Sequence, residues 1–250
     1  LEPIWVSLFN KNTYSCIKNR GIHAAEKDVK FALANDEAGT RYCLKIDVRK
    51  FYPSIDHEIL KNVVRRRIKD KRLLWLLDEI IDSVPSGVPI GNYLSQYFAN
   101  VYLAYFDHWL KEEKHVKYYW RYADDIVVLA PNKEVLHTLL HDIRAYLRDN
   151  LKLKVKRTYQ VFPVDSRGID FLGYVFFHSH TILRKTIKKR LFRRVAKLRK
   201  RKIVPTKEQY KQQICSWLGW CKYCNSIHLM SKIQNSIPYE IKFVRAKRKV

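Results

Sequence analysis

The stretch RYADDIVVLA, residues 121–130, places two adjacent carboxylates, Asp124 and Asp125, in a segment whose other residues favour a buried β-strand. Crowding like charges is unfavourable unless a positive group holds them. Together with the preceding residues, the sequence KYYWRYADDIVVLA predicts a β-hairpin with both aspartates at or beside its tip. A solvated hairpin turn is the alternative explanation for this pair taken alone.

A third carboxylate, Asp47, ends the segment YCLKID, whose alternating residues predict a strand that leads into a turn at Pro53. If this strand and the hairpin share one antiparallel sheet, Asp47 can lie beside the aspartate pair. Three converging carboxylates make a hard-oxygen site suited to Mg²⁺, with Mn²⁺ as a substitute. Two such ions about 3.5–4 Å apart can activate an attacking 3′ oxygen and stabilise a departing pyrophosphate.

The charge balance predicts a polyanionic partner. The chain has 49 Lys and Arg residues against 24 Asp and Glu residues, a formal net charge of +25 in 250 residues. Such a positive field favours nucleic acid, with an anionic membrane surface as the rival interpretation. No apolar run approaches the roughly 18 residues of a spanning helix, and no secretory pattern is present. Five cysteines suit a reducing compartment, so we expect a cytoplasmic protein without a membrane partner.

Basic residues concentrate in VVRRRIKDKR (63–72) and KTIKKRLFRRVAKLRKRK (185–202). A charge run is often only a solvated helix face, but its density on this chain favours contacts with a phosphate backbone. The residues expected to make such contacts are Lys18, Arg20, Arg65, Arg66, Arg67, Lys188, Lys189, Arg190, Arg193 and Arg194.

The remaining patterns predict an α+β chain with an antiparallel sheet and a helical C-terminal part. Helical spacing and turn residues predict helices over 54–68, 93–113 and 133–150, a loop over 86–92 and short strands over 155–164 and 171–177. Ser54 or Asp56 is the expected N-cap of the first helix, and the helix over 93–113 is expected to be amphipathic. Cys221 and Cys224 form a single C-x-x-C pair, which is weak support for zinc, so we expect buried thiols.

Four motifs occur in one order: LKIDVRKFYPSID, GVPIGNYLSQ, YADD and FLGY. In this order, the chain resembles the reverse transcriptases over roughly residues 14–234. The resemblance implies a right-hand polymerase that adds deoxynucleotides to a primer on an RNA template. Its implied parts are partial fingers over 1–43, palm over 44–56, fingers and palm helices over 57–89, palm with the hairpin and primer grip over 90–180, and a basic helical thumb over 181–250.

The resemblance also implies roles for individual residues. Asp47, Asp124 and Asp125 match the metal-binding aspartates, and the carbonyl of Val48 matches a backbone metal ligand. Tyr52 matches an aromatic residue that stacks under the incoming sugar and excludes a 2′-hydroxyl.

Further implied positions concern the primer and the nucleotide. The residues that match the primer grip are Phe171, Leu172, Gly173 and Tyr174. Ile90 and Gly91 lie in the nucleotide-binding element, and Lys156 lies where a lysine can protonate pyrophosphate. Lys152, Lys154 and Arg157 are nearby alternatives to Lys156.

The element GVPIGNYLSQ carries Ile90 where related enzymes have Gln, and Gln96 where they have Pro. This form is similar to the reverse transcriptases of diversity-generating retroelements. That group copies a template-repeat RNA into cDNA with frequent errors opposite adenines, together with a basic pentameric accessory variability protein. Because Ile cannot hydrogen-bond an incoming nucleotide, we hypothesise that Ile90 relaxes fidelity.

Two other interpretations stay open. Another prokaryotic reverse transcriptase, defence-associated or intron-type, would share the motifs but not the adenine-directed errors. A non-catalytic RNA-binding scaffold would keep the palm without turnover, although all three aspartates are present. Only about 13 residues precede YSCIKNRG, so we expect either that the chain is a fragment or that part of the fingers is missing.

Overall fold

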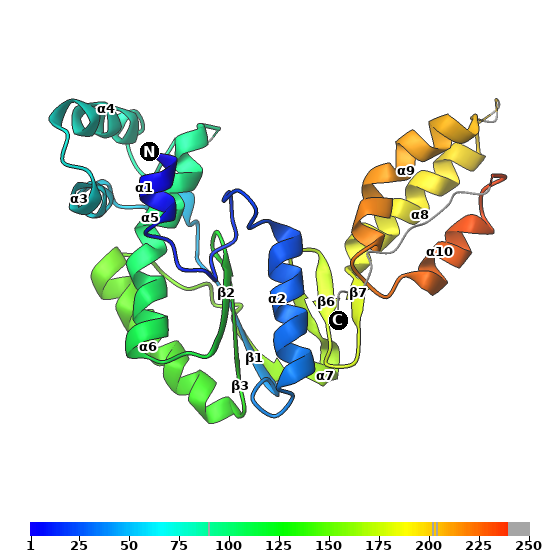
Figure 1. Ribbon diagram of the computed structural model, residues 1–250, viewed down its shortest axis with the longest axis horizontal. Helices are drawn as coiled ribbons and strands as arrows, with labels where there is room; N and C mark the ends of the chain where they lie inside the picture. The colour runs from blue at the N-terminus through cyan, green and yellow to red at the C-terminus, as the bar shows by residue number, and fades with distance from the viewer. Residues whose placement is uncertain (90, 202, 204, 240–250) are drawn as a thin grey trace. The chain divides into compact units, whose positions relative to one another are not determined.

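The computed structural model of the 250-residue chain describes residues 1–89, 91–201, 203 and 205–239. The chain divides into two compact units, Leu1–Ser166 and Arg167–Val250. Figure 1 shows their helices and strands.

A four-stranded sheet forms the centre of the first unit. Its strands are β1 (Tyr42–Asp47), β2 (Tyr118–Tyr122), β3 (Asp125–Ala130) and β4 (Gln160–Pro163). The strand order is β2-β3-β1-β4, and every neighbouring pair is antiparallel. The hairpin predicted over residues 117–130 is therefore confirmed, as is the expectation that it shares one antiparallel sheet with the strand ending at Asp47.

Helices surround this sheet, with α5 and α6 on one side and α2 on the other (Figure 1). The helical elements of the unit are α1 (Glu2–Val6), α2 (Ile22–Asn35), the 3₁₀ turn η1 (Tyr52–Ser54), α3 (His57–Arg67), α4 (Lys71–Asp82), α5 (Tyr93–His108), the π-helical turn η2 (Trp109–Glu113), α6 (Lys133–Leu151) and α7 (Val164–Arg167). The predicted N-cap of α3 is Asp56, whose Oδ1 accepts a hydrogen bond from the Ile59 N–H at 3.1 Å.

The alternation of strand side chains separates a core face from a site face. Ile46 and Ile126 are fully buried in the core that also includes α5 and α6. Asp47 and Asp125, one position along each strand, point to the other face because successive strand residues alternate. The core packing therefore fixes the face on which the carboxylates lie.

The helix predicted over 93–113 is present, but its amphipathic character is a wrong prediction. Regular α-helix ends at His108, and a π-helical turn follows. Between Ser95 and Asp107 nearly every side chain of α5 is buried. The reason is tertiary: α3 packs on α5 from one direction and α6 from another, so no solvent-facing stripe remains along most of its length.

The second unit has a small antiparallel sheet and three helices. Its elements are β5 (Ile169–Phe171), β6 (Tyr174–Phe176), β7 (Thr181–Leu183), α8 (Lys185–Arg199), α9 (Lys207–Cys221) and α10 (Ile227–Gln234). The single strand predicted over 171–177 is wrong, because Leu172 and Gly173 have positive φ angles of 52° and 87° and turn the chain. FLGY is therefore a hairpin turn between β5 and β6.

Apolar residues of α8 pack against α9 as the spacing in the basic run predicts. Leu191, Val195 and Leu198 are buried in one cluster with Tyr210 and Ile214 of α9. The basic side chains of α8 are left on its other faces.

Cys221 and Cys224 are both buried, which confirms the expected packing role for these thiols. Burial raises the pKa of Cys221 to about 12.

Within the described residues, no helix combines the length and the apolar character that crossing a membrane requires.

Candidate active site

Strand pairing brings two of the predicted aspartates directly opposite each other. In the β1–β3 ladder Asp47 is the partner of Asp125, and Asp125 also pairs with Tyr122 across the hairpin. Asp124 occupies the tip between β2 and β3, next to Ala123, which has a positive φ of 53°. The sheet thus places all three carboxylates at one end of β1 and the hairpin.

The carboxylates of Asp47 and Asp124 contact each other. Burial, together with the charge and hydrogen bond of Asp47, raises the pKa of Asp124 to about 6. The negative charge of Asp47 disfavours ionisation of Asp124 because like charges repel at short range. The site therefore has too little positive charge of its own and suits a bound cation.

Two lysine side chains contact the aspartates. The Lys156 ammonium Nζ is 2.7 Å from Asp47 Oδ1, and Lys45 Nζ is 3.5 Å from Asp125 Oδ2. The Lys156 N–H also donates to the Asp47 carbonyl at 2.8 Å. Hydrogen bonding to Asp47 raises the pKa of Lys156, so this ammonium stays charged beside the aspartates.

Val48 lies immediately after Asp47 and is fully buried. It forms an isolated antiparallel bridge with Val155, one residue before Lys156. This bridge aligns the two segments that carry Asp47 and Lys156. The assignment of the Val48 carbonyl as a metal ligand stays a prediction.

Tyr52 begins the 3₁₀ turn η1, and its phenol faces the site. Burial is the main cause of its raised pKa, followed by the nearby Cys16 and Asp124. The Val88 N–H donates to the Tyr52 carbonyl at 3.2 Å, and Gly87, with φ of 74°, packs on the same backbone. The loop before α5 therefore holds Tyr52 from behind.

Gly91 is exposed and has φ of 92°, a conformation that favours glycine. Its neighbour Ile90, the residue of the fidelity hypothesis, lies outside the described residues. The nucleotide-binding role of this loop stays a prediction.

Sequence reasoning missed a buried ion pair beneath the hairpin. The guanidinium of Arg121 in β2 and the carboxylate of Asp107 in α5 are both fully buried and hydrogen-bond at two points, Nε to Oδ1 at 2.8 Å and Nη2 to Oδ2 at 2.5 Å. The available signal was Arg121 itself, a permanent charge in an otherwise apolar and aromatic strand.

The predicted primer-grip residues mostly serve the core of the second unit. Phe171 and Tyr174 are fully buried, and the Tyr174 hydroxyl donates to the Trp220 carbonyl at 3.2 Å. A Cβ at Gly173 would meet side-chain atoms of Trp220 and Ile187. If this hairpin touches a primer, the turn at Leu172 and Gly173 is the part available for contact.

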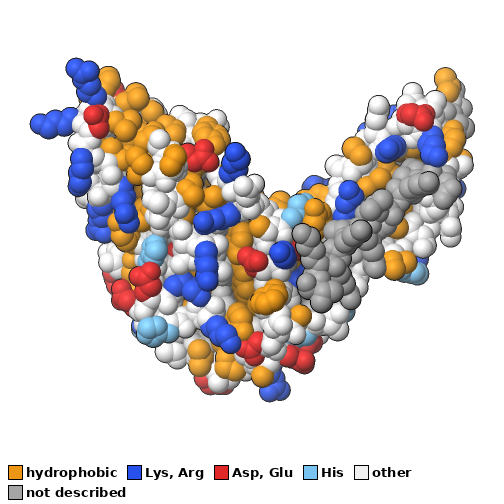
Figure 2. All heavy atoms as spheres, viewed as in Figure 1, with side chains coloured by type: hydrophobic (Ala, Val, Ile, Leu, Met, Phe, Trp, Pro, Cys, Tyr) orange, Lys and Arg blue, Asp and Glu red, His pale blue; other side chains and the backbone are white. Residues whose placement is uncertain are grey.

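Some of the basic residues predicted to contact a phosphate backbone already have partners within the protein. Arg65 pairs with Asp78 at 2.5 Å, Arg66 stacks over the Tyr105 ring at 4.7 Å, and Arg20 Nη1 donates to the Asn10 carbonyl at 3.2 Å. The exposed members are Lys18, Arg66, Arg67, Lys189, Arg190 and Arg193, and the half-buried ones are Arg20, Arg65, Lys188 and Arg194. Lys and Arg side chains appear along the whole face drawn in Figure 2.

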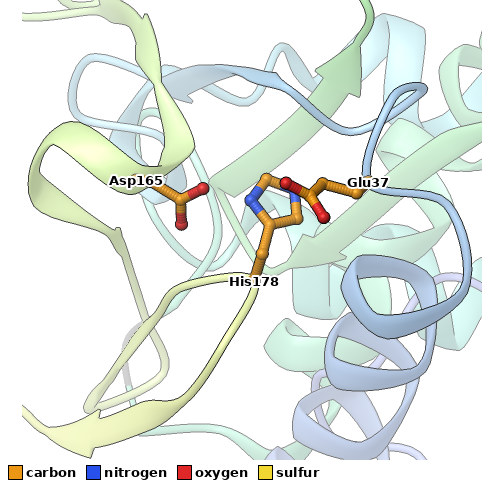
Figure 3. Close-up of side chains that lie close together, drawn as sticks. All are labelled: Glu37, Asp165 and His178. Atoms are coloured by element: carbon orange, nitrogen blue, oxygen red, sulfur yellow. The ribbon is translucent and has the colours of Figure 1, made fainter.

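Figure 3 shows Glu37, Asp165 and His178, which are not part of the aspartate site. Glu37 follows α2 and Asp165 lies in α7, both exposed in the first unit, whereas His178 follows β6 in the second unit. Because these side chains come from two separately described units, we assign no metal site to them.

Comparison with protein families shows the family of the chain. The family model for reverse transcriptase (RNA-dependent DNA polymerase) matches residues 1–176. The chain belongs to this family. The matched range contains the three aspartates, Tyr52 and Lys156.

Similar curated proteins come from bacteria and from introns. YkfC of Escherichia coli strain K12 is 27% identical over 228 residues, which covers 74% of this chain and 58% of that protein. The retron Ec73 reverse transcriptase of Escherichia coli is 26% identical over 249 residues and covers 93% of this chain and 75% of that protein. The group II intron-encoded protein LtrA of Lactococcus lactis subsp. cremoris is 26% identical over 124 residues, 46% of this chain and 20% of that protein. The chain thus spans less than two thirds of YkfC.

Solved structures of telomerase share the fold. Telomerase from Candida albicans, in complex with a fragment of telomeric RNA, superposes with a TM-score of 0.56 at 12% identity over 96% of this chain and 49% of that one. Apo telomerase from Candida tropicalis gives a TM-score of 0.54 at 11% identity over 92% and 48%. The fold class is therefore that expected from the sequence, an α+β right-hand polymerase with an antiparallel sheet.

Proposed function

We propose that this chain is an RNA-directed DNA polymerase that extends a primer with deoxynucleoside triphosphates on an RNA template. The observation that carries the proposal is the pairing of Asp47 with Asp125, with Asp124 at the adjoining hairpin tip, in a member of the reverse transcriptase family. Template RNA, the growing cDNA and the nucleotide are accordingly the proposed partners.

The residues present fit a site for Mg²⁺. Asp47, Asp124 and Asp125 supply carboxylate oxygens, the ligands that this ion prefers. The raised pKa of Asp124, caused by burial and by Asp47, indicates a site short of positive charge. When bound, two Mg²⁺ ions would supply activation of the 3′ hydroxyl and charge stabilisation at the phosphate.

The protein groups position the reactants around these ions. No side-chain nucleophile is needed, because the primer hydroxyl attacks the α-phosphate and pyrophosphate departs, so catalysis depends on positioning and charge stabilisation. The Tyr52 ring, half-buried beside Asp124, is proposed to block a 2′-hydroxyl. Lys156, which bonds Asp47, is proposed to keep a positive charge near the departing phosphate.

Primer extension on a defined RNA template tests this function. The assay would follow cDNA length with Mg²⁺ or Mn²⁺ and four deoxynucleotides, with the double substitution Asp124→Asn/Asp125→Asn as the control. We expect extension by the unmodified chain and none by the control. Template binding without extension under any condition would favour the RNA-binding scaffold instead.

The finer proposal is that synthesis is error-prone opposite template adenines, as in diversity-generating retroelements. It rests on the sequence form GVPIGNYLSQ, with Ile90 and Gln96 in place of Gln and Pro. An accessory variability protein, basic and pentameric, is the proposed partner. Sequencing the cDNA, with and without such a partner, would measure the error spectrum, and Ile90→Gln should reduce errors opposite adenine.

The second candidate is a retron-type or intron-type reverse transcriptase with ordinary fidelity. It is favoured by the similarity to the retron Ec73 enzyme over 93% of this chain and by the partial match to LtrA. Faithful copying of adenines by an active chain would select this candidate.

A further inference from the structure

The tip of the aspartate hairpin is tied to helix α5 by buried polar groups. Asp107 and Arg121 are both 0% exposed, so their two-point ion pair is entirely removed from solvent. Asp107 also accepts hydrogen bonds from Thr13 Oγ1 at 2.9 Å and from the Tyr119 hydroxyl at 2.5 Å. The Asp107 carboxylate thus accepts hydrogen bonds from Thr13 in the N-terminal segment and from two residues of β2, Tyr119 and Arg121.

One nitrogen of the guanidinium reaches beyond this pair to the hairpin tip. Arg121 Nη1 donates to the Ala123 carbonyl at 3.1 Å and to Asn100 Oδ1 at 3.1 Å. Asn100 belongs to α5, about two turns before Asp107. The planar fork of Arg121 therefore connects two points on α5 to the peptide that leads into Asp124.

Ala123 needs such support because its backbone is in the left-handed region, with φ of 53°. This conformation is unfavourable for an L-residue, so it persists only where surrounding contacts impose it. The Ala123 carbonyl belongs to the peptide unit that begins Asp124. Fixing this carbonyl fixes the direction in which the tip presents its carboxylates.

The N-terminal segment also binds the backbone of Arg121, along the edge of β2 that faces away from β3. The Arg121 N–H donates to the Asn12 carbonyl at 3.0 Å, and the Tyr14 N–H donates to the Arg121 carbonyl at 3.0 Å. Arg121 cannot readily shift along the strand, because its main chain and its side chain are held independently.

We propose that Arg121, held by Asp107, is a positioning residue that fixes Ala123 and thereby sets Asp124 and Asp125 for metal binding before nucleic acid arrives. This inference rests on the proposed polymerase function. Stability alone is a weak reason for the pair, since a buried ion pair is often no more stabilising than apolar residues of similar volume. Its specific contribution here is the geometry of the tip.

The test uses the whole chain and compares Arg121→Lys with two other variants. Lysine keeps a positive charge near Asp107 but lacks the planar fork, so it cannot hold Asp107 at two points and still reach the Ala123 carbonyl. Tyr102→Phe is the matched control, because Tyr102 is also fully buried on α5 and its hydroxyl donates to the Leu151 carbonyl at 2.7 Å, away from the tip. If Arg121→Lys does not fold, the pair Asp107→Leu/Arg121→Met removes both charges and takes its place.

Three readouts are measured on variants whose circular dichroism matches the unmodified chain. They are Mn²⁺ affinity by electron paramagnetic resonance without nucleic acid, amide hydrogen exchange over residues 122–126, and the Mg²⁺ dependence of primer extension. For Arg121→Lys we expect about tenfold weaker Mn²⁺ binding, faster exchange at the tip and a loss of about 100-fold in extension rate. Tyr102→Phe should change none of these beyond about twofold.

Unchanged Mn²⁺ affinity and tip exchange in a folded Arg121→Lys variant would overturn the positioning role. Failure of the unmodified chain to extend any primer would instead remove the proposed function. The metal-binding and exchange measurements would still decide whether Arg121 orders the tip.

Discussion

Lys156 Nζ lies 2.7 Å from Asp47 Oδ1, so the lysine considered as a proton donor to pyrophosphate is bonded to a candidate metal ligand. A second contact, from the Lys156 N–H to the Asp47 carbonyl at 2.8 Å, fixes the two backbones together. The Lys156 ammonium can therefore have two functions: it can balance the charge of Asp47, and it can donate a proton.

Substitutions of Lys156 distinguish these functions. Lys156→Arg keeps a positive charge beside Asp47 but removes a group able to donate a proton at neutral pH. We expect it to retain single-nucleotide addition within about tenfold, whereas Lys156→Gln should lose about 100-fold because both functions are absent. Rapid-quench measurement of the addition rate makes the comparison. An equal, large loss in both variants would mean that proton donation dominates.

Ionisation of Asp124 should lower the free energy of unfolding of the metal-free protein as the pH rises. Burial and Asp47 raise its pKa to about 6, above its ordinary value near 4. A raised carboxyl pKa means that ionisation is harder in the folded state, so stability should fall between about pH 4 and 6 and stay low above that. Asp124→Asn should therefore stabilise the metal-free protein at pH 7 by about 1–2 kcal/mol while abolishing extension.

Thermal denaturation in EDTA over pH 4–8 measures this effect. Asp142→Asn, at a half-buried position on α6, is the control, since pairing with Lys114 lowers the pKa of Asp142 and gives the opposite pH dependence. A metal-free melting temperature that is lower for Asp124→Asn than for the unmodified chain at pH 7 would contradict the prediction.

Removing the ring of Tyr52 should admit ribonucleotides. The phenol lies near Asp124, and the Gly87–Val88 backbone supports it from behind. We expect Tyr52→Ala to raise the ratio of ribonucleotide to deoxynucleotide kcat/KM by about 10–100-fold, because a steric barrier is lost. Tyr52→Phe keeps the ring and serves as control. Unchanged discrimination in Tyr52→Ala would exclude the gate role.

Two glycines of the loop before α5 allow a comparison of backbone strain with close packing against Tyr52. Both Gly87 and Gly91 have positive φ, but an added Cβ at Gly87 would meet the Tyr52 and Pro53 backbone, whereas one at Gly91 meets nothing within 4 Å. Gly91→Ala should lower the free energy of unfolding by about 1 kcal/mol through strain alone, and Gly87→Ala by about 3 kcal/mol or more. Urea denaturation provides both values, and similar losses would count against a tight Gly87–Tyr52 contact.

Asp56 combines an N-cap with an ion pair that holds α3. Its Oδ1 accepts from the Ile59 N–H, and its Oδ2 lies 2.6 Å from Lys152 Nζ. Asp56→Ala should cost about 1 kcal/mol, and Asp56→Asn less because asparagine still caps. The Lys152 hydrogen bond lowers the pKa of Asp56, so its contribution is present above about pH 4 and is lost as the pH falls through the folded pKa. Denaturation at pH 3 and pH 7 would show this, and a loss of stability for Asp56→Asn, relative to the unmodified chain, that is the same at both pH values would contradict it.

Local sequence pattern is enough to predict several parts of the site. Alternation around Asp47 predicted β1, and the two apolar stretches flanking the aspartates predicted the hairpin, because strand pairing follows period and turn chemistry. Asp56 was among the expected caps of α3 for the same local reason. These features need no knowledge of distant contacts.

The tertiary structure decided what depends on residues far apart in the chain. The 3.6-residue spacing suggested an amphipathic α5, but packing by α3 and α6 buries nearly all of it. Arg121 reads locally as an exposed charge, and only the approach of Asp107 from α5 makes its burial tolerable, because a buried guanidinium needs a fully hydrogen-bonded partner. In the same way, the sequence offers Lys156 together with several basic neighbours, and only the Val48–Val155 bridge brings its ammonium beside Asp47.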